Sequence, residues 1–181
     1  MNQLLSVNCV FVSALQRLYG QTFFAYVLKQ LSKALLENHS SIVKLEASKE
    51  DQSLIGEHRT KVKNILNCLI HFYLFQSISS EFLFSVIHYL LDSFTESDIE
   101  VLIFVLHNIG LQLRKKDPEA IKSILDSFTQ KKNSYQVSQK LDRSSPALSS
   151  FDQTLSPFEQ KLKFLVLELQ DIKNNKGNTT L

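Results

Sequence analysis

Apolar residues recur at every third or fourth position through most of this 181-residue chain. That spacing places them on one face of an α-helix and does not fit a strand, whose side chains alternate between two faces. Only three prolines and four glycines interrupt the pattern, and sheet-rich chains usually need more turn residues than that. The sequence therefore predicts an all-α protein.

The periodic segments predict about seven helices, arranged mostly as consecutive antiparallel pairs. The expected helices span roughly 4–18, 22–37, 62–75, 79–90, 96–113, 118–132 and 157–173. Two polar stretches, 38–60 and 133–155, lack a sustained period and are predicted to be a long loop and a serine-rich flexible insert. Pairs of this size favour a HEAT-like α-α superhelix, or solenoid, although a compact helical bundle fits the same pattern.

Residues 1–181 are expected to form a single, partial helical repeat domain, because the odd helix count starts almost at Met1. The first helix is expected to bury its stripe of apolar residues. The members of this stripe are Leu4, Val7, Phe11, Ala14, Leu15 and Leu18. Gly20 is expected to end this helix, and the helix from Glu96 has apolar residues on more than one face, so it should be the most buried.

Three later helix starts carry capping signals. Thr95 followed by Asp98 resembles a capping box, and Ser156-Pro157-Phe158-Glu159 combines a capping serine, an early proline and a glutamate three residues on. Asp117-Pro118 predicts a further start with Asp117 as the N-cap. These boundaries should be the best defined in the chain.

The chemistry-bearing residues form no catalytic or metal-binding pattern. The four glycines are isolated, so no phosphate-binding loop is present, and no nucleophile motif occurs. Cys68 and His71 could be two metal ligands on one helical face, but a structural site needs four, and a core cysteine beside a histidine is the simpler interpretation. Cys9 and Cys68, far apart in sequence, fit reduced thiols. We expect no enzyme, cofactor or metal.

The formal net charge of the chain is only +2, so any basic binding site must be local. Arg114-Lys115-Lys116 follows one predicted helix and Lys131-Lys132 ends the next. Such residues often only complement the helix macrodipole. The functional alternative is a protein- or RNA-facing edge, although no aromatic residues interleave with these lysines to stack RNA bases. No apolar run is long enough to span a bilayer, and we expect no membrane partner and an intracellular location.

The segment from Thr95 to Leu125 carries a specific resemblance. A Thr-Glu-x-Asp-Ile-Glu helix start runs from Thr95 to Glu100, and an Asn-x-Gly-x-x-Leu-Arg-Lys-x-Asp turn runs from Asn108 to Asp117. Upstream, His71 and Tyr73 form a His-x-Tyr pair, and the closing helix runs from Lys161-Leu162-Lys163-Phe164 to Ile172-Lys173-Asn174-Asn175. This arrangement resembles the middle domain of translation initiation factor 4G (MIF4G), most closely its nucleolar relatives. The family usually has arginines where Lys161 and Lys163 stand, and further helices before the first one here.

The resemblance implies a scaffold without catalysis that binds and activates a DEAD-box RNA helicase of the initiation factor 4A type. In the nucleolar branch it implies a role in pre-ribosomal RNA processing and small-subunit biogenesis, hence a nuclear, nucleolar location, with the cytoplasm as the alternative. The competing functions are a direct RNA-binding module, in contact with RNA or pre-ribosomal particles, and a truncated copy that folds without binding. The candidate partner-binding residues are Arg114, Lys115, Lys116, Asp117, Lys173 and Asn174.

Overall fold

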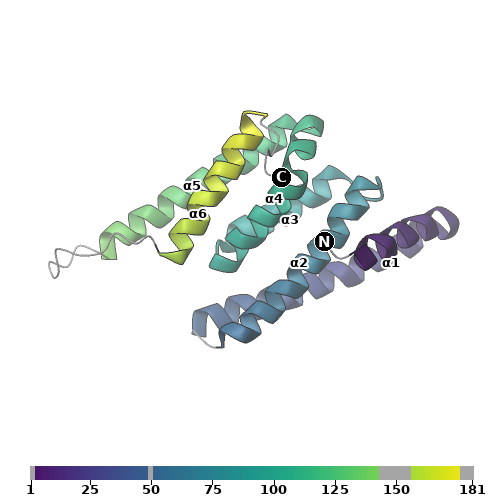
Figure 1. Cartoon of the computed structure of the whole chain (residues 1–181), viewed down its shortest axis with the longest axis horizontal. Helices are drawn as coiled ribbons and strands as arrows, with labels where there is room; N and C mark the ends of the chain where they lie inside the picture. The colour runs from purple at the N-terminus through teal and green to yellow at the C-terminus, as the bar shows by residue number, and fades with distance from the viewer. Residues whose placement is uncertain (1–2, 49–50, 143–155, 176–181) are drawn as a thin grey trace.

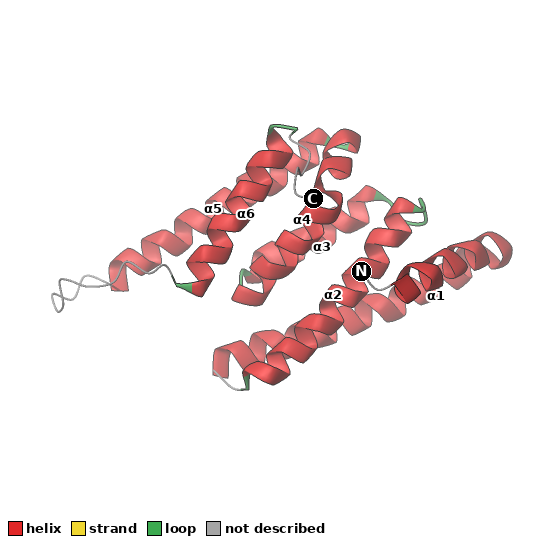
Figure 2. Ribbon diagram, viewed as in Figure 1, coloured by secondary structure: helices red, strands yellow, loops and turns green. Residues whose placement is uncertain are grey.

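The computed structural model describes residues 3–48, 51–142 and 156–175, all of them helix, turn or short connection, with no strand among them. Figure 2 shows this all-helical composition. The helices are α1 (Gln3–Ser48), α2 (Gln52–Leu74), α3 (Ser80–Ser93), α4 (Glu96–Lys116), α5 (Pro118–Asp142) and α6 (Pro157–Lys173). The prediction of an all-α fold is confirmed.

The helices form two layers of a HEAT-like stack. Figure 1 shows α2, α4 and α6 running in one direction in the near layer, with α3, α5 and most of α1 behind them. Contacts between matching positions confirm the parallel register: Arg59 of α2 reaches Ser97 near the start of α4, and Gly110 late in α4 lies against Ile172 late in α6. Each antiparallel pair thus packs on the next, as in a solenoid.

Gly20 divides α1 into two helical segments, 3–19 and 21–48. Its φ of 81° lies in the left-handed region, where glycine carries no Cβ penalty. Cys9 on the first segment and Phe24 on the second both contact the last half of α2, through Cys68 and Phe72. A straight helix cannot bring residues 9 and 24 to the same place, so the chain reverses at Gly20. The predicted helical hairpin and its glycine are therefore confirmed.

The predicted loop 38–60 is wrong, because α1 continues to Ser48 and α2 already begins at Gln52. The helices continue because His39, Ile42 and Ile55 are buried at helical spacing. Polar residues occupy other inward positions and pair with one another, as when His58 Nδ1 hydrogen-bonds Asn38 Oδ1 at 2.9 Å. An apolar period cannot be seen where the contacts between two helices are polar.

The predicted insert 133–155 is wrong over its first part, because α5 extends to Asp142. Tyr135 lies two turns after the buried Phe128 and packs against Phe158 of α6, with ring centroids 4.7 Å apart. That aromatic contact continues the inward face of the helix among serines and lysines. Residues 143–155 lie outside the described residues.

The predicted caps are confirmed. Thr95 and Asp98 form a reciprocal capping box at α4, and Ser156 and Glu159 form one at α6. Asp117 Oδ1 accepts a hydrogen bond from the Ala120 N–H at 3.0 Å, which caps the start of α5.

Helix α4 lies at the centre of the stack, as expected from its apolar residues on several faces. It packs against α2, α3, α5 and α6 and carries ten buried residues, more than any other helix in the described part of the chain. The close approach of α6 leaves no room for a side chain at position 110 unless Ile172 shifts. A Cβ at Gly110 would lie 2.3 Å from Ile172 Cδ1.

The apolar stripe of the first segment is exposed rather than buried, so that expectation is wrong. The segment packs instead through its other side, which carries the buried Cys9. Leu4, Val7, Phe11 and Leu18 are between 62% and 78% exposed. The sequence shows that a helix has an apolar face, but it does not say whether a neighbour covers that face.

A buried polar chain joins the first two helix pairs. His39 Nε2 donates to Asp98 Oδ1 at 2.7 Å, because an ionised carboxylate only accepts, and His39 Nδ1 then accepts from the Tyr89 hydroxyl at 2.8 Å. Asp98 also accepts from the Thr95 N–H at 2.9 Å. His39 and Asp98 are 3% and 1% exposed. At this depth each polar atom needs its partner.

Loss of His39 should therefore cost more than loss of the Tyr89 hydroxyl. We expect His39→Ala to lower the free energy of unfolding by about 3 kcal/mol, because it leaves the Asp98 carboxylate buried without its main partner. Tyr89→Phe, which removes one hydrogen bond, should cost about 1 kcal/mol. Urea denaturation followed by circular dichroism measures both. Equal costs would contradict a special role for the His39–Asp98 contact.

Two glycines in helices provide a matched pair. Gly56→Ala, where nothing lies within 4 Å of the new methyl group, should stabilise the protein by about 0.5–1 kcal/mol through helix propensity. Gly110→Ala should destabilise it by about 1–2 kcal/mol, because the methyl group displaces Ile172. Adding Ile172→Val, which removes Cδ1, should recover part of that loss in a double-mutant cycle. Stabilisation by both alanines would show that α6 can move aside freely.

Candidate functional site

The predicted partner-binding residues lie at the ends of two parallel helices. Because α2, α4 and α6 run in the same direction, their last turns meet along one side of the stack, at the upper right of Figure 1. We call this side the C-terminal edge and define it by residues 71–76, 113–117 and 172–175. The last carbonyls of all three helices point toward it, and such ends favour cations.

Two motifs that are distant in sequence meet at this edge. The Lys116 ammonium lies 4.9 Å from the centre of the Tyr73 ring, a cation–π contact between the end of α4 and the end of α2. Tyr73 is 3% exposed, and burial raises the pKa of its hydroxyl. Its Oη has no hydrogen-bond partner among the described residues. The aromatic ring thus positions a lysine whose charge stays at the surface.

The four residues of the α4–α5 turn divide into two kinds. Lys115 and Lys116 are exposed. Arg114 is half-buried, and its Nη1 is enclosed without a hydrogen-bond partner in the described part of the chain. Asp117 is half-buried and belongs to the turn itself, since its N–H donates to the Leu113 carbonyl at 2.8 Å while its side chain caps α5. The two lysines are therefore the groups that a partner can reach.

Lys173 and Asn174 lie at the end of α6, and both are exposed. The Asn174 N–H closes the helix by donating to the Gln170 carbonyl at 2.9 Å. Ile172, next to them, packs on Gly110, one turn before Arg114. The structure thus places the end of α6 against the last third of α4, beside the α4–α5 turn.

The edge has the chemistry of a binding surface. Lysine ammonium groups on rigid helix ends can bind carboxylates or phosphates as point charges. The described residues contain no group of three or more His, Cys, Asp or Glu side chains that could hold a metal ion. Of the two residues considered as ligands, Cys68 lies beside Cys9, and His71 Nδ1 donates to the Asn67 carbonyl at 2.7 Å.

The opposite edge holds a charge network that sequence reasoning missed. Glu100 of α4 accepts hydrogen bonds from Lys63 and Arg59 of α2, at 2.6 and 2.7 Å, and from Lys161 of α6 at 2.9 Å. Lys161 also reaches Glu96 at 2.9 Å. One carboxylate therefore joins the starts of α4 and α6 to the first half of α2. The cations cannot be paired with Glu100 from sequence, because they lie 37 to 61 positions away.

Glu100 stays ionised in this network. Burial alone would raise its pKa, but the hydrogen bonds from Lys63 and Lys161, with the nearby charge of Arg59, lower the pKa to about 2. Burial would likewise lower the pKa of Lys161, and the two glutamates raise it instead. Opposite charges at the starts of α4 and α6 thus pair with one another, whereas Lys115, Lys116 and Lys173 at the C-terminal edge are exposed.

Comparison with known proteins agrees with this architecture. The family model described as MIF4G domain matches residues 3–176. The chain belongs to the MIF4G domain family. Domains of this family mediate protein or RNA interactions. The motifs that carried the resemblance lie at the start of α4, in its capping box, and at its end, where Lys116 contacts Tyr73.

Two relatives indicate which branch of the family this chain resembles. Suppressor of glycerol defect protein 1 of Schizosaccharomyces pombe is 27% identical over 176 residues, which cover 97% of this chain and 19% of that protein. Nucleolar MIF4G domain-containing protein 1 of Homo sapiens is 27% identical over 121 residues, 66% of this chain and 12% of that protein. The chain thus spans about a fifth or less of the length of these relatives. No solved structure matches it significantly.

Membrane insertion finds no support in the helices of this MIF4G domain. None of the helices that the structure describes combines the length and the apolar composition needed to cross a bilayer.

The Glu100 network predicts the acid sensitivity of the MIF4G domain. The pKa of Glu100 is lowered in the folded state, so the unfolded chain binds more protons between about pH 5 and pH 2. The stabilisation is complete above that range and is lost as the pH falls through it. We expect Glu100→Gln to unfold more easily at pH 7 but to lose less stability between pH 5 and pH 3, measured by urea denaturation at each pH.

Glu57→Gln is the matched control for this prediction. Glu57 pairs with Lys61 one turn away on the surface, which lowers the pKa of Glu57, but solvent screens this exposed pair. This variant should keep nearly the wild-type dependence on pH. An equally steep acid loss in Glu100→Gln and in the wild type would show that other carboxylates control acid unfolding.

Proposed function

We propose that this MIF4G domain is a non-catalytic scaffold that binds and activates a DEAD-box RNA helicase of the initiation factor 4A type, in nucleolar small-subunit biogenesis. Family membership supports a scaffold or RNA-associated role. The name of the human relative places that protein in the nucleolus, which supports a nuclear, nucleolar location for this chain. The resemblance of the Thr95–Asp117 segment to the nucleolar branch supports the choice of helicase.

The observation that carries the proposal is the pair of exposed lysines on a buried support. Lys116 rests on the Tyr73 ring, and Lys115 beside it is exposed at the end of the most buried helix. Lys173 adds a third cation at the end of α6. Since the ends of α4 and α6 are held by the contact of Gly110 with Ile172, the spacing of these charges is fixed before binding. A preorganised surface loses little entropy when it meets an acidic partner.

A rigid surface of this kind can activate an enzyme without contributing a catalytic group. A DEAD-box helicase has two lobes, and a scaffold that binds one arrangement of them better shifts the population toward it. The lysines would contribute mainly association rate and orientation, because exposed charges steer an encounter more than they add affinity. The half-buried Arg114 and Asp117 would act by holding the turn that carries the lysines.

Direct RNA binding is the competing function, because the same lysines could contact phosphates. Tyr73 does not support it, since a ring that is 3% exposed and covered by Lys116 offers no face on which a base could stack. RNA binding by the edge would show a steep fall in affinity with salt. That salt dependence, measured with a single-stranded RNA and without helicase, distinguishes the two functions.

The test is a charge reversal at the edge. We expect Lys115→Glu with Lys116→Glu to weaken the binding of a purified helicase of the initiation factor 4A type by about tenfold or more. The same variant should reduce the stimulation of the helicase's RNA-dependent ATPase by the chain. Affinity is measured by biolayer interferometry without RNA, and ATPase activity with and without the 181-residue chain.

The control carries the same change in charge elsewhere. Lys44 on α1 and Lys122 on α5 are both exposed, and Lys44→Glu with Lys122→Glu should bind and stimulate like the wild type. Circular dichroism confirms that both variants fold. If neither variant changes helicase binding, the C-terminal edge is not part of the interface. If the wild-type chain binds RNA but no helicase, the competing function is favoured.

A further inference from the structure

The first segment of α1 exposes an apolar seam at regular helical spacing. Positions 4, 7, 11, 14 and 18 alternate steps of three and four residues, and all five side chains are exposed. We call this set the N-terminal seam. Its members are Leu4, Val7, Phe11, Ala14 and Leu18, and the exposed Val10 and Tyr19 flank it. Single exposed apolar side chains are ordinary, but a contiguous stripe of them marks an interaction surface.

The spacing of the seam indicates what shape covers it. Apolar residues three and four positions apart form the stripe that one helix presents to another in a coiled coil. The seam spans four helical turns, and a single helix of similar length would cover it. An extended peptide, whose side chains alternate between two faces, would not match this spacing.

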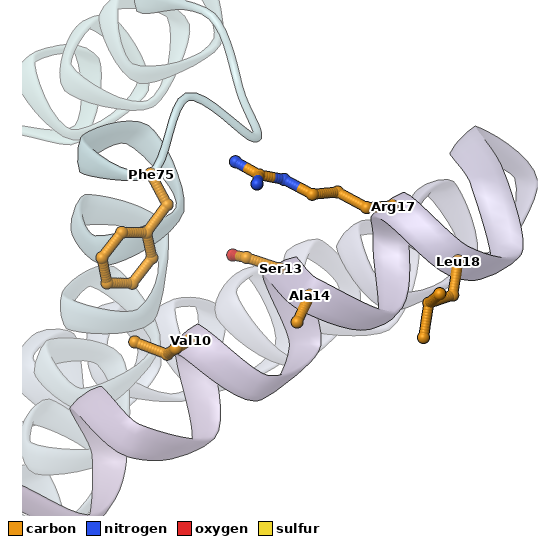
Figure 3. Close-up of a pocket in the computed structure, with 6 residues that line it drawn as sticks. All are labelled: Val10, Ser13, Ala14, Arg17, Leu18 and Phe75. Carbon is orange, nitrogen blue, oxygen red and sulfur yellow. The ribbon is translucent and has the colours of Figure 1, made fainter.

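A cavity opens beside the last half of the seam. Figure 3 shows it between the first segment of α1 and the end of α2, with Val10, Ala14 and Leu18 along one side and Phe75 on the other. Its volume is about 500 Å³, enough for a bulky apolar side chain of a bound helix. Ser13 and Arg17 complete its lining.

The charge in the cavity beside the seam is positive. Arg17 is the one charged residue in the lining of the cavity, and the described part of the chain gives it no ion pair. A second copy of the chain would bring like charges together. An acidic helix would bring the opposite charge, so it fits this surface better.

We propose that the N-terminal seam binds an acidic amphipathic helix. Its apolar stripe packs on Leu4, Val7, Phe11 and Leu18, one bulky side chain enters the cavity beside Phe75, and a flanking carboxylate pairs with Arg17. The seam lies on α1, and its cavity borders the C-terminal edge at Phe75. It gives the scaffold a second docking surface, specific for a helix rather than for nucleic acid.

The test uses two synthetic helical peptides with the 181-residue chain. Both are fluorescein-labelled 18-residue peptides with Leu at alternating three- and four-residue steps. One has Glu and Ala at the remaining positions, and the other has Lys and Ala. Fluorescence anisotropy should show that the Glu peptide binds about tenfold or more tightly than the Lys peptide. Raising the salt concentration should weaken the binding of the Glu peptide.

Three variants locate the binding site. Phe11→Ser should weaken binding of the Glu peptide by about tenfold or more, because it removes a central anchor. Phe164→Ser on α6, which removes an equally exposed phenylalanine, should leave binding unchanged. Arg17→Glu should weaken binding of the Glu peptide and strengthen binding of the Lys peptide. Since all three side chains are exposed, the variants should fold, which circular dichroism verifies.

Several outcomes would overturn the proposal. Equal binding of the two peptides, binding that Phe11→Ser leaves unchanged, or no binding of either peptide would exclude an acidic helix as the occupant. A dimer in sedimentation equilibrium that Phe11→Ser dissociates would show that a second copy covers the seam instead. Association with phosphatidylserine vesicles in the absence of peptide binding would assign the seam to a lipid surface.

Discussion

The start of α4 joins the three helix pairs of this protein. Asp98 holds His39 of the first pair and, through it, Tyr89 of α3. Two residues further on, Glu100 draws together α2 and α6 through Lys63, Arg59 and Lys161. Replacing such groups by apolar residues can leave stability unchanged, but removing one partner leaves a buried charge uncompensated. The motif from Thr95 to Glu100 therefore fixes how neighbouring repeats are placed relative to one another.

That placement determines the candidate site at the other end of the same helices. Because α2, α4 and α6 run in the same direction and Glu100 joins all three, their ends lie together as well, and Lys116 meets the Tyr73 ring. The contact of Gly110 with Ile172 holds α6 against the last third of α4. The charges that a partner can reach thus lie on the ends of packed helices rather than on loops. Such a surface keeps its shape when it binds.

Much of the fold could be predicted from the sequence, and the failures share one cause. The helix starts at Thr95, Asp117 and Ser156 were predictable because a cap is a local hydrogen bond between nearby residues. Gly20 was predictable as a helix break for the same local reason. The loop expected at 38–60 is instead helix, because His39 and Asn38 satisfy their polar groups on other helices. A polar residue in a buried position looks like a surface residue until its partner is known.

The candidate site shows the same division. The positions of Lys115, Lys116, Lys173 and Asn174 at helix ends follow from the sequence, and the structure shows all four exposed. The enclosure of Arg114 and the support of Lys116 by Tyr73 depend on packing that the sequence does not show. The ion pairs of the Glu100 network likewise join residues 37 to 65 positions apart. The exposure of the seam at Leu4 and Phe11 could likewise not be predicted, since an apolar face in the sequence does not show whether a neighbouring helix covers it.

The sequence by itself determined the helices, their caps, the break at Gly20 and membership in the MIF4G domain family, because each rests on residues within a few turns of one another or on a specific motif. The tertiary structure decided which apolar stripe is buried, which charges are paired and which lysines remain exposed. Those properties arise from packing between helices, where burial makes an unpaired charge costly and so selects the contacts that form.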